Sequence, residues 1–128
     1  MANVFLPCNN GTTGGAVLDF TSQTLDFSGM KEGKTYRFAI KFYQSGTKTP
    51  YDITGDAFEM SIKDSGNTEV ENLQVLAGFT ILETNILVGI ITPLTTGTAG
   101  RYTHELTWDI GTAGNPAILL TGKIVVKA

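Results

Sequence analysis

Apolar and polar residues alternate with a period of two along most of the chain after residue 16. From Lys34 to Tyr43 the aromatic and aliphatic positions fall on one face of an extended segment, and the same alternation returns from Arg101 to Trp108. Alternation of this kind is typical of a half-buried strand in an antiparallel sheet. It predicts strands over both segments, with Leu106 and Trp108 on the inward face of the second.

Shorter alternating or apolar runs predict further strands, separated by turns rich in Gly, Asn, Asp and Thr. These runs are Ala57–Lys63, Val70–Leu76, Phe79–Leu82 and Asn85–Thr92, followed by a hairpin that pairs Ala117–Leu120 with Lys123–Val126 across Thr121-Gly122. A helical turn is expected at Leu94–Gly97. The pattern predicts an all-β fold, a single antiparallel β-sandwich of about seven to nine strands, with a small barrel as the second choice.

The first fifteen residues differ from the rest, because the stretch Asn9–Gly15 is turn-rich and offers little to bury. We interpret residues 1–15 as an extended N-terminal arm and residues 16–128 as the β-sandwich domain. The arm carries an apolar tip that is the candidate intersubunit contact: Val4, Phe5, Leu6 and Pro7. The same segment fits equally well as an edge strand folded back on its own domain.

Composition narrows the classes of function. The chain has 128 residues, 41% of them hydrophobic, which is enough for a core without disulfides or metals. Its net charge of −3 and lack of a basic cluster argue against a nucleic-acid partner. The longest apolar run is too short for a membrane helix, and the N-terminus lacks the pattern of a signal peptide. We therefore expect synthesis in the cytoplasm and no membrane partner.

Catalytic, cofactor and metal sites are not expected. His104 and Cys8 are the sole residues of their types, which is too few for a zinc site, and neither a nucleophile elbow nor a phosphate-binding glycine loop occurs. Acidic pairs such as Asp52 with Asp56, or Glu69 with Glu71, are interpreted as solvated charges. The sequence thus predicts a protein that is not an enzyme.

We interpret the histidine and most of the aromatic residues in this region as structural residues. His104 lies on the inward face of its strand and is predicted to be a partly buried structural histidine. Trp108 is in phase with the core, and the Tyr102 hydroxyl is expected to tie a loop. Tyr43 and Tyr51 lie near turns, which makes them the candidate exposed aromatic contacts of a binding surface.

Several short motifs follow one another along the chain in a characteristic order. The chain has an alternating aromatic strand at 36–42, then Pro50-Tyr51-Asp52-Ile53-Thr54-Gly55, then Gly100-Arg101-Tyr102-Thr103-His104-Glu105-Leu106, and it closes with Gly122-Lys123-Ile124-Val125-Val126. This order resembles the small immunoglobulin-like β-sandwich domains of tailed-bacteriophage virion proteins, of the baseplate, tail-adaptor or head-decoration type. The resemblance carries no active-site residues.

The resemblance implies a structural component of a virion, made in the host cytoplasm. Its partners would be capsid, portal or tail subunits, contacted in multiple copies or as a homo-oligomer through strand edges, loops and the N-terminal arm. A second interpretation remains open, because β-sandwiches also serve as carbohydrate-binding or host-surface-adhesion modules. That interpretation requires exposed aromatic side chains at Tyr43, Tyr51 or Trp108.

Overall fold

The computed structural model describes residues 2–8, 23–44, 49–109 and 116–128. Within these ranges the chain forms one curled sheet and a single helical turn, α1 (Pro93–Thr96). The strands are β1 (Ala2–Cys8), β2 (Gln23–Thr24), β3 (Phe27–Lys31), β4 (Tyr36–Gln44), β5 (Ala57–Lys63), β6 (Glu69–Val75), β7 (Gly78–Leu82), β8 (Ile86–Ile91), β9 (Gly100–Asp109) and β10 (Ala117–Lys127). Within the same ranges, no helix has the length and apolar character needed to cross a membrane.

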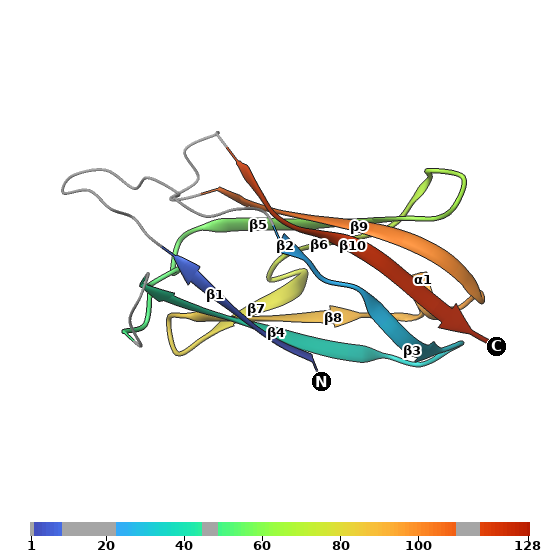
Figure 1. Cartoon of the computed structure of the whole chain (residues 1–128), viewed down its shortest axis with the longest axis horizontal. Helices are drawn as coiled ribbons and strands as arrows, with labels where there is room; N and C mark the ends of the chain where they lie inside the picture. Colours follow the sequence, from blue (N-terminus) through green and yellow to red (C-terminus); the bar gives the residue numbers. More distant parts are fainter. Residues whose placement is uncertain (1, 9–22, 45–48, 110–115) are drawn as a thin grey trace.

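The strands follow one continuous path of hydrogen-bonded neighbours, in the order β1-β4-β8-β7-β6-β5-β9-β10-β2, and β3 also pairs with β10. Because β2 and β3 lie one after the other along β10, they form a single interrupted strand at one edge of the sheet. β1 forms the opposite edge. Figure 1 shows the sheet curled nearly into a barrel, with β9 and β10 on one side and β4 and β8 on the other.

The prediction of an all-β domain is confirmed, and the strands predicted from alternation lie close to their expected bounds. The sheet is mixed, however, because β1 with β4, β2 with β10, β3 with β10 and β6 with β7 pair in parallel. The expectation of a purely antiparallel fold is therefore wrong. Alternation reports which face of a strand is buried, and it carries no information about the direction of the neighbouring strand.

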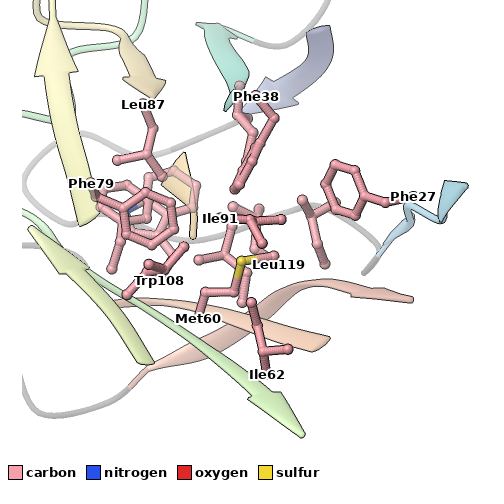
Figure 2. Close-up of a cluster of buried hydrophobic side chains, with 14 of the residues drawn as sticks. Phe27, Phe38, Met60, Ile62, Phe79, Leu87, Ile91, Trp108 and Leu119 are labelled. Carbon is pink, nitrogen blue, oxygen red and sulfur yellow. The ribbon is translucent and has the colours of Figure 1, made fainter. Parts of the chain in front are cut away.

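The core lies between the two sides of the curled sheet. In β5 and β9 alternate side chains are buried, as the alternation predicts. Trp108 is fully buried, with the rings of Phe42 and Phe58 packed on it at centroid separations of 5.0 and 5.8 Å. Figure 2 shows Phe27 and Phe38 in the same cluster, and their ring centroids lie 5.3 Å apart. The apolar faces of strands distant in the sequence thus share one core.

The hairpin predicted at Thr121-Gly122 is not formed. Residues 117–127 make one continuous strand, β10, which pairs with β9 along its length. Gly122 lies within this strand, opposite His104. A Cβ at Gly122 would overlap the carbonyl oxygen of Leu25. The glycine is therefore explained by the close approach of another backbone segment, and not by a turn.

The predicted helical turn is confirmed as α1, and it joins the β3–β4 turn to the start of β9. The hydroxyl of Thr96 donates to the carbonyl of Lys34 at 2.5 Å, and the backbone N–H of Gly33 donates to the carbonyl of Thr96 at 2.7 Å. The Tyr102 hydroxyl donates to the carbonyl of Thr98 at 2.6 Å, which confirms that this side chain ties a loop. These bonds close one end of the curled sheet.

Candidate functional site

The N-terminal strand β1 lies along the outer edge of β4. The two strands run parallel, and all seven residues of β1 pair without a register shift. The candidate contact residues Val4, Phe5, Leu6 and Pro7 stand opposite Ile40, Lys41, Phe42 and Tyr43. In the single chain this segment thus forms an edge strand, and its contact with a neighbouring subunit stays a prediction. The side chains of β1 and the boundary predicted between residues 15 and 16 lie outside the described residues.

β4 has a neighbour on each side. β8 pairs along one side, from Tyr36 opposite Ile91 to Lys41 opposite Ile86, and β1 pairs along the other. Without β1, the backbone N–H and C=O groups on the outer side of β4 would lack partners. An edge of this kind is a template for any extended segment that reaches it. Pro7 is compatible with an outermost strand, since a proline lacks the N–H that an interior strand needs.

The β2/β3 edge of the sheet is held by a hydrogen bond from a buried histidine. His104 projects from β9 over Gly122 of β10, and its Nε2 lies 2.6 Å from the carbonyl oxygen of Leu25, in the break between β2 and β3. Because a carbonyl oxygen can only accept, Nε2 carries the proton. Asp26 accepts a hydrogen bond from the backbone N–H of Lys123 at 2.9 Å. The interrupted strand is therefore joined to both β9 and β10.

The environment of His104 favours the neutral imidazole. Burial lowers its pKa below the usual value of 6.5, while the hydrogen bond to Leu25 and the charge of Asp26 act in the opposite direction with smaller effects. Nδ1 is buried and has no hydrogen-bond partner among the described residues, so a proton placed there would lack an acceptor. The ring packs on Phe27 with a centroid separation of 5.4 Å. These contacts confirm the predicted structural histidine.

The candidate aromatic surface is not assembled as predicted. Tyr51 is 8% exposed and meets Trp108 edge-on at a centroid separation of 5.8 Å, so the expectation that it is exposed is wrong. The reason is that the backbone N–H of Tyr51 donates to the carbonyl of Phe42, which folds this segment back onto the core. Trp108 is buried as predicted and donates to Asp56 at 2.9 Å. Tyr43 is half-buried.

Two aspartates in loops, Asp52 and Asp64, serve local structure. Asp52 accepts from the backbone N–H of Thr54 at 2.8 Å, and hydrogen bonds from the side chain and backbone of Thr54 lower the pKa of this carboxyl. Asp64 accepts from the backbone N–H of Gly66 at 2.9 Å in the β5–β6 turn. In the part of the chain that the structure describes, no group of three or more His, Cys, Asp or Glu side chains is arranged to hold a metal ion.

Glu71 lies in an environment that the sequence did not predict. The expectation that Glu71 is a solvated charge is wrong, because only 5% of the residue is exposed. Its carboxylate accepts from the hydroxyl of Thr92 at 3.0 Å, the hydroxyl of Thr95 at 2.6 Å and the backbone N–H of Thr92. Thr92 is the N-cap of α1. The buried charge thus has hydrogen-bond partners and fixes the helical turn.

A polar groove of about 630 Å³ crosses the outer face of β5, β9 and β10. Its charged side chains are of both signs: Asp26, Lys63, Glu105 and Lys123. Hydroxyl groups of serine and threonine lie between them, and none of the described Phe, Tyr or Trp residues lines the groove. A sugar ring would therefore find hydrogen-bonding groups there but no aromatic platform on which to stack.

Comparisons with known proteins find likeness in structure but not in sequence family. No family model matches the sequence, and no curated protein matches it. Among solved structures, the N-terminal domain of phage TP901-1 ORF48 is similar over the whole of both chains, with 11% sequence identity and a TM-score of 0.47.

Proposed function

We propose that this protein is a non-enzymatic structural component of a tailed-phage virion, which binds neighbouring capsid, portal or tail subunits through strand edges, loops and its N-terminal segment. The proposal takes its assignment to virions, and the likeness to immunoglobulin-like domains, from the motifs at 36–42, 50–55, 100–106 and 122–126. The observation that carries the assembly role is the pairing of β1 along the edge of β4. That pairing demonstrates an edge with a defined register for an extended segment.

The remaining described features support a contact role over catalysis. His104 is 3% exposed and bonded to Leu25, and Glu71 is 5% exposed and bonded to two threonines. Asp56 holds the indole of Trp108. These three groups are thus engaged in holding strands and turns together. The burial of Tyr51 and Trp108 also removes two of the three aromatic side chains that were candidates for a sugar-binding surface.

The experiment that tests this proposal measures how much of the protein stays bound to virus particles. Deletion of residues 1–15 removes β1, and we expect this variant to stop co-sedimenting with virions or with capsid or tail assemblies. A narrower variant, Val4→Pro with Phe5→Pro, breaks the backbone pairing of β1, and Val4→Ala with Phe5→Ala is its matched control. We expect the proline variant to lose occupancy and the alanine control to retain most of it. Unchanged occupancy after the deletion would refute the role proposed for this segment.

A further inference from the structure

We propose that protonation of His104 releases residues 23–26 from β10, so that the β2/β3 edge of the sheet opens in response to pH. The released segment consists of β2 and of the break between β2 and β3, Leu25 and Asp26. The inference goes beyond the proposed function and does not depend on it.

The released segment has few bonds to the rest of the sheet. β2 is two residues long. In the break, the backbone N–H of Leu25 donates to the carbonyl of Thr121 at 2.9 Å. The backbone N–H of Lys123 donates to the carboxylate of Asp26, also at 2.9 Å. β3 differs, because it carries two buried side chains, Phe27 and Met30. Residues 23–26 can therefore open locally while β3 stays in the core.

The bond from His104 reaches the segment across β10. Nε2 donates to the carbonyl oxygen of Leu25 at 2.6 Å, over the position of Gly122. A Cβ at Gly122 would lie 2.7 Å from Nε2, so the glycine leaves the space that this bond needs. Since Nε2 carries the proton, Nδ1 is unprotonated, and it is buried without a hydrogen-bond partner among the described residues.

A second proton on the ring is incompatible with the closed segment. It would create a buried cation whose Nδ1–H has no acceptor. The ring is 3% exposed and packs on Phe27, so water does not solvate the charge while the segment is closed. Burial accordingly lowers the pKa of His104. In the open form the ring meets water and binds the proton more tightly, so opening is favoured as the pH falls through 6.5.

The charges around the ring do not supply the missing acceptor. The carboxylate of Asp26 favours the charged ring, but its effect is smaller than that of burial. Glu71 of β6 lies in the same cross-strand row, separated from His104 by Ile62, and threonine hydroxyls bind its carboxylate. Tyr102 is neutral, since burial raises the pKa of its hydroxyl. The other charged side chains near the break line the groove on the outer face: Lys63, Glu105 and Lys123.

Release would change two neighbouring surfaces. Thr24 and Asp26 form part of the lining of the polar groove, so this part of the lining would move away. The carbonyl of Thr121 and the backbone N–H of Lys123 would lose the partners that they have in the closed form. Unpaired backbone groups along a strand edge accept an extended segment of another chain. Acid thus makes the edge of β10 available for pairing.

Native-state hydrogen exchange of the full chain tests this opening. The reporters are the amides of Leu25 and Lys123, and the reference is the set of amides in β5, which lies between β6 and β9. After correction for the intrinsic effect of pH on exchange, we expect reporter protection to fall roughly fivefold to tenfold between about pH 7.5 and about pH 5.5, as linkage to one proton allows. Low urea should leave reporter exchange unchanged and accelerate reference exchange, because a local opening exposes little surface.

Two variants assign the pH dependence to its group. His104→Gln retains a donor for the Leu25 carbonyl but cannot titrate, so its reporter protection should not change with pH. Asp26→Asn retains an oxygen acceptor for the N–H of Lys123 and should keep the pH dependence. The proposal is overturned if reporter protection in the wild type is independent of pH, if its pH dependence survives His104→Gln or is lost in Asp26→Asn, or if urea accelerates reporters and reference alike. Particle occupancy is a separate readout, so none of these results decides the proposed function.

Discussion

The two edges of the curled sheet are built in different ways. The interrupted strand β2/β3 is fastened through the core, since Phe27 and Met30 are buried and His104 bonds to Leu25 across β10. β1 is placed by its backbone register on β4. The contacts described for the two edges thus differ in kind: buried side chains and a bond across the sheet hold β2/β3, whereas the backbone register with β4 places β1, whose side chains lie outside the described residues.

The largest effect should come from truncating the core-bound edge. Phe27→Ala removes a side chain that packs on Phe38 and His104. We expect a loss of about 3–5 kcal/mol in the free energy of unfolding, as for other buried aromatic residues. Urea denaturation measures this loss, and Ser28→Ala, at an exposed position of the same strand, is the control. A loss no larger than that of the control would mean that β3 is not part of the core.

The second effect concerns the close approach at Gly122. Gly122→Ala places a methyl group on the carbonyl oxygen of Leu25, so the interrupted strand must move away from β10. Overpacking of this kind typically costs about 1–3 kcal/mol. Thr121→Ala, the adjacent position in β10, should change stability far less. Equal stability of the two variants in urea would contradict the contact between these backbones.

The third effect is a dependence of stability on pH that arises at the core-bound edge. Because burial lowers the pKa of His104, the unfolded chain binds its proton more tightly than the folded protein does. The free energy of unfolding should therefore begin to fall as the pH drops through 6.5 and continue to fall until the lower folded pKa is reached. His104→Gln retains a donor for the Leu25 carbonyl but cannot titrate. Its stability curve should lose this step, and an unchanged curve would assign the step to other groups.

The smallest effect on stability should come from the edge-bound strand. Deletion of residues 1–8 removes β1, and we expect a smaller loss in the free energy of unfolding than for Phe27→Ala, because β4 stays paired with β8 along its other side. A loss as large as that of Phe27→Ala would show that β1 is structurally equivalent to β3 and would remove the distinction between the two edges.

The sequence predicts which faces of the strands are buried better than it predicts how the strands are joined. Alternation at 101–108 correctly places His104 and Trp108 in the core, because burial of every second residue is a local property of a strand. The role of Gly122 could not be predicted, since it depends on Leu25, a residue distant in the sequence. The Thr121-Gly122 pair resembles a turn in the sequence. In the structure Gly122 instead allows the backbone of Leu25 to approach closely.

The candidate site shows the same limit. The N-terminal segment was identified from its apolar tip, but its parallel pairing with β4 depends on the path of the whole chain. The position of Tyr51 near turns predicts an exposed side chain, yet a backbone hydrogen bond to the carbonyl of Phe42 turns this segment inward. Glu71 can be buried because Thr92 and Thr95 supply its hydrogen bonds. Those residues follow it in the sequence only after two further strands, β7 and β8.

Hydrogen exchange of backbone amides tests the difference between the two edges most directly. Amides held by a core-bound strand open only in rare, large fluctuations, whereas those of an edge occupant open locally. In the full chain at neutral pH, we expect amides of residues 2–8 to exchange much faster than those of residues 27–31. Equal and strong protection of both segments would contradict the account, because β1 would then be as firmly bound as β3.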